Sequence, residues 1–417
     1  MSVIVMKFGG SSVGTPERMR RVAQRIVDRK REGNRCLVVV SAMGDTTDDL
    51  IDLSKQICDG APPAREMDML LTTGEQVSVA LLAMAIQSLG EEARSYTGWQ
   101  TGIYTEAVHG KARISHIEPK RVQDALEKDC IVIVAGFQGM TEDGEITTLG
   151  RGGSDTTAVA VAAAIKADLC EIYTDVEGVY STDPRIVKCA RKLNEISYDE
   201  MLELANLGAA VLHPRAVECA KLNQVRLVVR SSFNHNEGTL VKEEAAMEQG
   251  IVVSGIAYDK NVARISILGV PERPGQLAKV FTALANQQVD VDIIVQSGVQ
   301  DSADFSFTVG SSDLDKAMTI IASIKETVGY RETTSETGLV KVSIVGAGMV
   351  SNPGVAAKMF EAISELGISI NMVSTSEIKV SCVIPNSRLN EVIQTLHTAY
   401  GLDTDTTVSV GGPQDRR

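Results

Sequence analysis

Several features that mark common protein classes are scarce or missing in this chain. The five histidines do not cluster at ligand spacing, which argues against a zinc site made by the protein alone. The seven cysteines are scattered without a C-x-x-C pair, so we expect reduced, mostly buried thiols of a cytoplasmic protein. The net charge is −13 at pH 7 and no basic stripe occurs, which argues against nucleic-acid binding.

Targeting and membrane signals are also missing. The first residues, MSVIVMKFGG, lack the charged start, apolar stretch and cleavage site of a signal peptide. No apolar run approaches the length of a membrane span, so we expect no membrane partner. What the chain has instead is length, because 417 residues with 44% hydrophobic content predict two or three domains with large cores.

The most informative segment runs from Gly150 to Thr157 and reads Gly-Arg-Gly-Gly-Ser-Asp-Thr-Thr. Glycines let backbone N–H groups approach a ligand, and the Ala/Val-rich run that follows predicts a helix whose N-terminus favours anions. Arg151 offers a planar fork for a carboxylate or phosphate. We therefore interpret the segment as a site for a small acidic ligand. The alternative is an ordinary glycine turn in which Ser154 or Asp155 caps the helix.

A second glycine turn follows the apolar run Val3 to Phe8, which predicts a buried strand. Gly9 to Ser12 come next, and Thr15 then predicts the N-cap of a helix that runs to about Arg31. Strand, glycine turn and helix form a phosphate cradle, with Lys7 in reach of a transferred phosphoryl group. The Walker loop and the protein-kinase motifs are missing, which excludes those two classes of phosphotransferase.

Residues 1–240 alternate continuous apolar runs with helical patterns. Strands are expected at 36–41, 130–136 and 171–174, and a helix at 76–89. This alternation favours an α/β fold with a mostly parallel sheet between helices. The polar, acidic stretch 238–250 predicts the link to the remaining third of the chain.

That last third contains an internal repeat. Residues 265–281 (ISILGVPERPGQLAKVF) resemble residues 342–360 (VSIVGAGMVSNPGVAAKMF), and each copy predicts strand, Pro-Gly turn, helix and strand. A strand at 304–309 and a helix at 312–328 continue the first copy, and 379–384 and 387–400 continue the second. This order predicts two α+β units of the βαββαβ type. Either a duplicated oligomerisation domain or a ligand sensor fits the pattern.

The second copy also contains Gly346-Ala347-Gly348 after a predicted strand, which hints at a dinucleotide-binding fingerprint. Ser351 stands where the third glycine is expected. We therefore interpret this segment as part of the repeat.

Six segments, in order, closely resemble those of aspartokinases. They are KFGGSS at 7–12, VVVSAMGDTTDDL at 38–50, TTGEQ at 72–76, GFQG at 136–139, TTLGRGGSDTTA at 147–158 and YTDVEGVYSTDPR at 173–185. The tail is similar to the tandem ACT domains of monofunctional, feedback-inhibited members. The resemblance covers nearly the whole chain and implies an amino-acid-kinase domain at 1–240. It also implies a linker and first regulatory strand at 241–262, and ACT domains at 263–340 and 341–417.

The implied reaction transfers the γ-phosphoryl group of ATP to the side-chain carboxylate of L-aspartate, with Mg²⁺ carried by ATP rather than by a protein metal site. A carboxylate is ionised at pH 7, so transfer needs no general base and depends on positioning and charge neutralisation. The resemblance implies catalytic roles for Lys7, Glu75, Arg151 and Asp155. It implies ATP binding by Lys7, Phe8, Gly9, Gly10, Ser41, Thr174, Asp175, Tyr180, Asp183 and Arg185. It implies aspartate binding by Ser41, Thr47, Glu75, Arg151, Gly152 and Ser154.

Several of these residues have a plainer interpretation on the sequence alone. Glu75 fits a first-turn helix acid, Ser41 fits a strand end, and Asp183 with Pro184 fits an ordinary turn. Only the family resemblance favours a functional role for them. One departure concerns the nucleotide, because some family members have a lysine shortly after a strand that ends in Ser-Ser. Here Ser231-Ser232 is followed by Phe233-Asn234-His235.

Regulation and assembly follow from the resemblance. It implies the first step of lysine, threonine and methionine synthesis, with feedback by lysine, threonine or both. It also implies a homodimer through the ACT domains, or an α2β2 assembly whose smaller subunit starts at Met247; a simple linker methionine is the alternative there. The expected effector residues are Glu272, Pro274, Gly275, Asp292, Ile293, Gln296, Asn371 and Ser376. Because Asp292 stands where the second repeat has Asn371, we predict that the two repeats are not functionally equal.

Two competing functions remain open on the sequence. A sister acylphosphate kinase of the same fold, such as a glutamate kinase, shares KFGG but not the full set of segments. Loss of Lys7 or Arg151 would have favoured a non-catalytic amino-acid sensor. Both residues are present, which argues against it.

Overall fold

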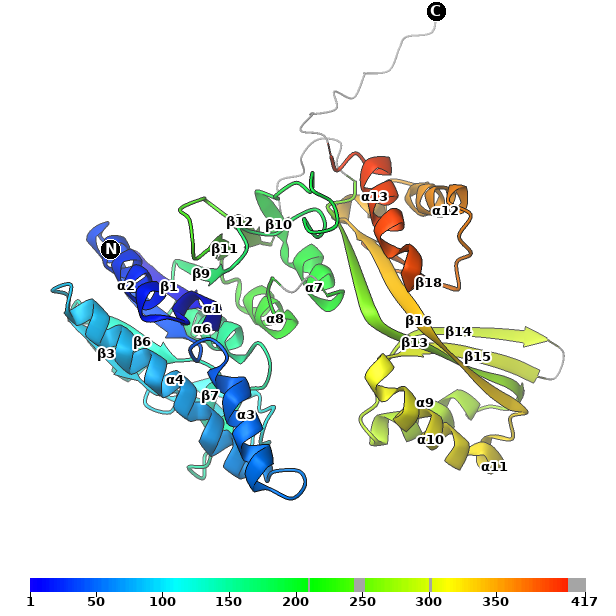
Figure 1. Cartoon of the computed structure of the whole chain (residues 1–417), viewed down its shortest axis with the longest axis horizontal. Helices are drawn as coiled ribbons and strands as arrows, with labels where there is room; N and C mark the ends of the chain where they lie inside the picture. The colour runs from blue at the N-terminus through cyan, green and yellow to red at the C-terminus, as the bar shows by residue number, and fades with distance from the viewer. Residues whose placement is uncertain (209–210, 244–251, 300–301, 404–417) are drawn as a thin grey trace, which may run out of the picture. The chain divides into compact units, whose positions relative to one another are not determined.

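The computed structural model describes residues 1–208, 211–243, 252–299 and 302–403. The chain divides into two compact units (Figure 1). The first comprises Met1–Val179, Lys192–Asn206 and Ala210–Ala246, and the second comprises Tyr180–Arg191, Leu207–Ala209 and Met247–Arg417. The segment Tyr180–Arg191 therefore belongs with the second unit, although it lies between strands of the first in the sequence.

An eight-stranded sheet forms the centre of the first unit, in the order β10-β12-β11-β9-β1-β2-β6-β3. All neighbouring strands run parallel except β11 and β12. The mostly parallel sheet is therefore the predicted one. The strands are β1 (Val3–Phe8), β2 (Arg35–Val40), β3 (Ala93–Tyr96), β6 (Ile131–Ala135), β9 (Leu169–Thr174), β10 (Glu195–Ser197), β11 (Leu227–Ser231) and β12 (Thr239–Lys242).

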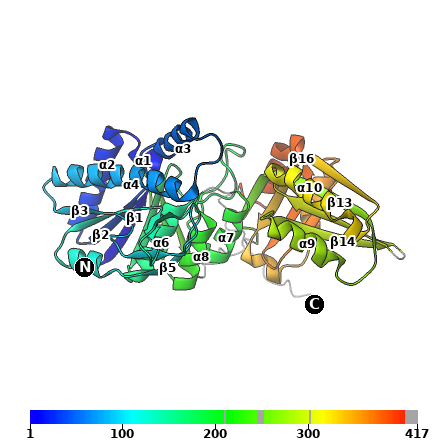
Figure 2. The same ribbon diagram turned by 90° about the horizontal axis from the view of Figure 1, so that it is seen from below.

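Helices cover both faces of this sheet (Figure 2). One face packs Met6, Val38 and Ile133 into a core with α2 and α4, and the alternate strand residues face α6. Two-sided burial explains why these strands read as continuous apolar runs. The helices are α1 (Gly10–Val13), α2 (Pro16–Arg31), α3 (Thr46–Ile57), α4 (Ala64–Gln87), α5 (Lys120–Glu127), α6 (Gly153–Ala164), α7 (Tyr198–Asn206) and α8 (Pro214–Asn223).

Two helix predictions have different outcomes. The helix predicted from Thr15 is confirmed as α2, whose Arg18 amide donates to the Thr15 hydroxyl at 3.3 Å. The helix predicted at 76–89 begins twelve residues earlier, at Ala64. A Cβ on Gly74, inside this helix, would lie 2.9 Å from Ala42 Cβ, so close packing requires the glycine.

The expectation that no apolar run approaches membrane-span length does not hold for α4. By length and composition alone it is long and apolar enough to cross a membrane, and half of its apolar window is buried inside the protein. It contributes Val79, Leu82 and Ile86 to the core beside α2. Met69, Val77, Leu81 and Met84 of the same helix are exposed, so burial accounts for only part of its hydrophobic composition.

A small four-stranded sheet, in the order β5-β4-β7-β8, follows the carboxyl end of β6, because its strand β7 begins at Gln138 and β6 ends at Ala135. Its strand β8 leads directly into the segment Leu149–Gly152 and then into α6. The strands are β4 (Ile103–Thr105), β5 (Ile114–Ile117), β7 (Gln138–Met140) and β8 (Ile146–Thr148).

The second unit contains one six-stranded sheet, ordered β14-β15-β13-β16-β18-β17. Its two long central strands, β13 and β16, are antiparallel. Half of each strand pairs within the first repeat and the other half pairs within the second repeat. Residues 255–259 of β13 pair with residues 341–345 of β16 in the second repeat, and residues 264–268 pair with residues 332–336 in the first. The strands are β13 (Gly255–Pro271), β14 (Val291–Val299), β15 (Ser302–Val309), β16 (Glu332–Val345), β17 (Met372–Thr375) and β18 (Lys379–Pro385).

Helices of the second unit lie in two pairs, α9 with α10 and α12 with α13 (Figure 1). The predicted helix at 312–328 is divided at Ile324 into α10 and α11. Gly346 leads into a short 3₁₀ helix, Ala347–Ser351, as part of the repeat. Met247 lies outside the described residues. The helices are α9 (Gln276–Asn286), α10 (Leu314–Ser323), α11 (Lys325–Val328), α12 (Val355–Glu365) and α13 (Leu389–Ala399).

Candidate active site

The carboxyl ends of the parallel strands β9, β1, β2 and β6 meet at one edge of the sheet, where α/β proteins bind ligands. Lys7 lies near the end of β1, and its Nζ is 2.6 Å from Asp155 Oδ1 on α6. Both side chains are nearly buried, with 12% and 13% of their surface exposed. Two residues far apart in the sequence, both predicted to be catalytic, are thus brought together.

The glycine turn after β1 packs against the loop after β2. A Cβ on Gly10 would lie 2.8 Å from the Ala42 carbonyl oxygen, and the Gly44 amide donates to the Gly10 carbonyl at 3.1 Å. Ser41 donates its amide to the Phe8 carbonyl at 3.1 Å. The hydrogen bond to Phe8 therefore holds Ser41 beside the glycine turn, and Gly10 leaves no room for a side chain between the turn and the loop.

Glu75 on α4 contacts the loop after β2. Its side chain is 3% exposed, and Oε1 accepts a hydrogen bond from the Ala42 amide at 3.1 Å. Oε2 is buried and finds no hydrogen-bond partner among the described residues. Burial raises the pKa of Glu75 to about 7, because desolvation outweighs the hydrogen bonds to the carboxylate. A buried, half-satisfied carboxylate at a predicted binding site is suited to receive a cationic group.

The turn Gly150–Gly153 places the other predicted substrate residues at the same sheet edge. Gly152 has a left-handed φ of 67°, and a Cβ there would lie 2.1 Å from the His213 ring. Ser154 is buried next to Gly136, where a Cβ would approach the Ser154 hydroxyl to 2.6 Å. Sequence analysis did not identify His213, which caps α8 and whose pKa is lowered by burial.

Arg151 differs from its neighbours because its side chain is exposed. No hydrogen bond or ion pair joins its guanidinium to another residue in the described parts of the chain. Thr47 lies in the first turn of α3, directly after the loop that carries Ser41. Arg151 therefore keeps its full set of donors for a ligand.

Sequence analysis also did not identify Arg215 on α8, which anchors the Gly150–Gly153 turn through hydrogen bonds to backbone carbonyls. Its Nη1 donates to the Leu149 carbonyl at 2.6 Å, and its Nη2 donates to the Ala112 carbonyl at 2.9 Å. Burial lowers the pKa of Arg215, as does the neighbouring charge of Arg113. A 66-residue sequence separation from Leu149 leaves no local pattern that would have revealed this contact.

The expected nucleotide side of the site lies at the ends of β9 and β11. The Thr174 hydroxyl donates to Asp175 at 3.1 Å, and the Ser232 amide donates to the Thr174 carbonyl at 2.8 Å. Ser232 Oγ lies 2.5 Å from Ser12 Oγ in the first glycine turn, just before Phe233–His235, where some family members have a lysine. On the neighbouring strands β1 and β9, the rings of Phe8 and Tyr173 stack with centroids 4.6 Å apart.

Tyr180, Asp183 and Arg185 belong to the second unit. Asp183 accepts hydrogen bonds from Arg185 Nη2 at 2.8 Å and from the Tyr258 hydroxyl at 2.9 Å. Hydrogen bonding to Arg185 lowers the pKa of Asp183. Their part in nucleotide binding stays a prediction.

The expected effector residues are distributed over the second unit. Glu272, Pro274 and Gly275 are exposed at the start of α9, and Gln296 is exposed on β14 beside the buried Ile293. Asp292 forms an ion pair with Lys341 of β16, which the sequence did not indicate.

The second repeat supplies the remaining two effector residues. Asn371 donates to Glu336 at 3.2 Å and lines a cavity of about 380 Å³ with Arg264 and Val373. Ser376 is exposed after β17. Asp292 thus forms a charged pair and Asn371 an amide contact, and the functional inequality of the two repeats stays a prediction.

Comparison with known proteins agrees with this architecture. A model of the amino acid kinase family matches residues 2–231, and two models of the ACT domain match residues 263–326 and 342–400. The matches define an amino acid kinase followed by two ACT domains, which confirms the predicted fold class.

Relatives over nearly the full length identify the family. The chain is 57% identical to the aspartokinase of Bacillus sp. (strain MGA3), over 96% of this chain and 98% of that one. It is 56% identical to aspartokinase 2 of Bacillus subtilis, over 96% and 98%. The chain belongs to the aspartokinase family, and the prediction of a kinase is confirmed.

A solved structure supports the same assignment. Aspartokinase III of E. coli, in complex with aspartate and ADP, is 25% identical and superimposes with a TM-score of 0.81, covering 95% of this chain and 99% of that one. The same protein in complex with lysine and aspartate gives a TM-score of 0.75, covering 96% and 99%.

Proposed function

We propose that this chain transfers the γ-phosphoryl group of ATP to the side-chain carboxylate of L-aspartate, giving 4-phospho-L-aspartate and ADP. One observation carries the proposal: the guanidinium of Arg151, which is exposed and pairs with no other described residue, lies on the turn that leads into α6, the helix whose Asp155 holds Lys7. One short segment thus carries both the proposed carboxylate clamp, Arg151, and the carboxylate that pairs with the proposed phosphate-binding ammonium of Lys7.

The residues divide the substrate between them. Arg151 binds a carboxylate of aspartate in a bidentate manner, and Glu75 binds its ammonium group. Ser41, Thr47, Gly152 and Ser154 supply the remaining hydrogen bonds. The acceptor carboxylate is ionised at pH 7 and needs no base, so the enzyme contributes position and charge.

Lys7 and the amides of Gly9 and Gly10 hold the phosphates of ATP, and Thr174 and Asp175 line the nucleotide. Lys7 neutralises the charge that develops on the transferred group, and Asp155 keeps its ammonium at the end of β1. Phosphoryl transfer of this kind depends almost entirely on such positioning, and the ion pair between Lys7 and Asp155 supports this part of the proposal.

Mg²⁺ fits this site as a partner of the nucleotide. No three His, Cys, Asp or Glu side chains gather at ligand distance within the described residues, whereas Asp155 supplies one carboxylate beside Lys7. Mg²⁺ is commonly held by one or two carboxylates together with substrate phosphates, where it neutralises phosphate charge.

An ATP-dependent hydroxamate assay tests the function. Hydroxylamine traps an acyl phosphate, and we expect product with aspartate, Mg²⁺ and ATP but not with glutamate. Product with glutamate alone would favour a sister acylphosphate kinase. No product from folded protein with either amino acid would favour a non-catalytic amino-acid sensor.

Regulation and assembly extend the proposal. The two ACT domains support feedback inhibition by lysine, threonine or both, at the first step of lysine, threonine and methionine synthesis in the cytoplasm. They also support a homodimer through these domains, or an α2β2 assembly with a smaller subunit started at Met247. A single species on a denaturing gel, after expression of the untagged native gene, would count against the internal start.

A further inference from the structure

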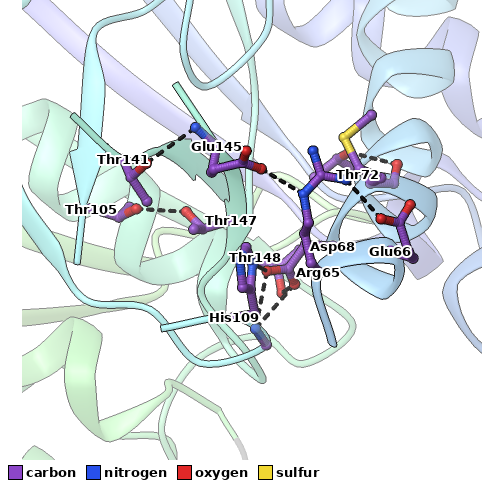
Figure 3. Close-up of polar contacts among 12 residues, drawn as sticks. Arg65, Glu66, Asp68, Thr72, Thr105, His109, Thr141, Glu145, Thr147 and Thr148 are labelled. Carbon is purple, nitrogen blue, oxygen red and sulfur yellow. Dashed lines mark hydrogen bonds and ion pairs between the residues drawn. The ribbon is translucent and has the colours of Figure 1, made fainter. Parts of the chain in front are cut away.

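A fully buried carboxylate on α4 connects three segments of the first unit (Figure 3). Asp68 Oδ1 accepts a hydrogen bond from the Thr148 hydroxyl of β8 at 2.5 Å, and Oδ2 lies 2.7 Å from His109 Nδ1. The Gly110 amide donates to both oxygens at 3.1 Å. Asp68 is 0% exposed, so these donors replace its hydration.

The number of donors explains why this position holds a carboxylate. An ionised aspartate accepts at two oxygens, whereas an asparagine accepts at only one and turns two N–H donors toward its neighbours. A buried charge is stable only when hydrogen-bonded partners compensate for lost water. The network therefore constrains Thr148 and the loop at Gly110 relative to α4.

These constraints reach the turn that carries Arg151. Thr148 is followed by Leu149 and Gly150, and its carbonyl accepts a hydrogen bond from the Ala112 amide at 2.9 Å. A Cβ on Gly150 would lie 3.2 Å from the Gly110 carbonyl oxygen, so the turn rests directly on the loop that Asp68 holds. The two anchors act from different sides, Asp68 through α4 and Arg215 through α8.

We propose that Asp68 is a positioning residue of the kinase reaction: with His109 and Thr148 it holds the Gly150–Gly153 turn so that Arg151 faces the acidic substrate. The inference deepens the proposed function and rests on it. Asp68 itself touches no substrate in this scheme. Its loss misorients Arg151 and weakens binding of the amino-acid substrate, while Lys7 and the glycine turn after β1 stay in place.

Neighbouring threonines of β8 provide a matched test. Thr148→Val removes the hydroxyl that donates to Asp68, whereas Thr147→Val removes an equally buried hydroxyl that lies 2.6 Å from Thr105 Oγ1 (Figure 3). Hydrogen bonds to charged groups, when lost, weaken binding roughly tenfold to a hundredfold. We expect Thr148→Val to raise KM for aspartate about tenfold or more, with KM for ATP within about twofold of wild type. Thr147→Val should leave both KM values near wild type.

His109 supplies a second pair of variants. In His109→Asn the amide nitrogen takes the place of Nδ1 and keeps the donor to Asp68, whereas His109→Leu removes it. We expect His109→Asn to retain a KM for aspartate near wild type and His109→Leu to raise it. A structural role alone would lower the melting temperature of both threonine variants without separating the two KM values.

The outcomes distinguish this inference from the proposed function. If wild-type protein phosphorylates aspartate but Thr148→Val and His109→Leu keep its KM for aspartate, Asp68 is not a positioning residue. An equal rise in KM for aspartate and for ATP would also overturn the inference. If wild-type protein makes no aspartyl hydroxamate at all, the proposed function itself fails, and the inference fails with it.

Discussion

Replacing Glu75 with glutamine should make the protein more stable and less able to bind aspartate. The carboxylate is 3% exposed, and its pKa is raised from 4.5 to about 7 by burial. Glutamine keeps the oxygen that accepts from the Ala42 amide and removes the buried charge. The two effects have opposite signs because the charge that binds a cation opposes folding when the site is empty.

The pH dependence follows from the direction of the pKa change. Between pH 4.5 and about 7 the unfolded chain has already lost the Glu75 proton while the folded chain still holds it, so wild-type stability falls as pH rises. A rise from 4.5 to about 7 corresponds to about 3 kcal/mol, reached in full above pH 7. Glutamine does not titrate, so its stability advantage is near zero at pH 4 and about 3 kcal/mol at pH 8.

Urea unfolding at pH 5 and pH 8, with KM for aspartate over the same range, measures both effects. Hydrogen bonds to charged groups contribute about 1.5–3 kcal/mol, so KM should rise about tenfold to a hundredfold in Glu75→Gln. In wild type, KM for aspartate should rise as pH falls below about 7, because Glu75 becomes neutral.

Glu66 is the control for this experiment. It lies on the same helix, is exposed and pairs with Arg65, so Glu66→Gln should change stability by no more than about 0.5 kcal/mol at either pH. An unchanged KM in Glu75→Gln, or a stability gain that is the same at pH 5 and pH 8, would refute the reasoning.

Four further predictions concern other parts of the molecule. Asp155→Asn removes the charge that holds Lys7 and should lower kcat about a hundredfold or more with little change in melting temperature; an unchanged kcat would contradict the role of the pair. Gly152→Ala should be more destabilising than Gly90→Ala, because both have positive φ but only the former would collide with another side chain, that of His213; equal effects in urea unfolding would indicate that strain alone matters. Burial lowers the pKa of His397, whose Nε2 lies 3.0 Å from Ser181 Oγ. Wild-type stability should therefore fall as pH drops below about 6.5, and in His397→Leu the melting temperature should depend less on pH in that range. Asp292→Ala should change inhibition by at least one of lysine and threonine, and titrations that match wild type for both would show that Asp292 is not an effector residue.

The elements with strong local patterns could be predicted from the sequence. Continuous apolar runs indicated β1, β2, β6 and β9, and the Pro-Gly repeat indicated the order of elements in both ACT domains. The two glycine turns indicated an anion site because glycine, a basic residue and a helix start occur together. For each strand and glycine turn the information lies within about twenty residues, which is the range over which periodicity and capping act, whereas the repeat is recognised by comparing its two copies.

Contacts between distant segments could not be predicted in this way. Asp68 and Thr148 are 80 residues apart in the sequence. Nothing in the residues around either one indicates that the buried Asp68 carboxylate accepts a hydrogen bond from the Thr148 hydroxyl. The same holds for His213 beside Gly152 and for the strand halves that β13 and β16 exchange. These features depend on tertiary packing, which satisfies buried polar groups regardless of sequence distance.

The glycines of the first turn show how packing changes the interpretation of a motif. From the sequence, Gly9 and Gly10 have the same role, because both allow backbone amides to approach phosphate. In the structure a Cβ on Gly9 would lie 3.5 Å from Lys7 Nζ, an ordinary contact, whereas one on Gly10 would lie 2.8 Å from the Ala42 carbonyl oxygen, which is backbone and unable to move aside. Gly10 is therefore required for the folded state before any ligand binds, and Gly9 borders the space beside the Lys7 ammonium. A motif that predicts one phosphate cradle from the sequence thus combines a packing requirement with a binding requirement, and only the distances separate the two.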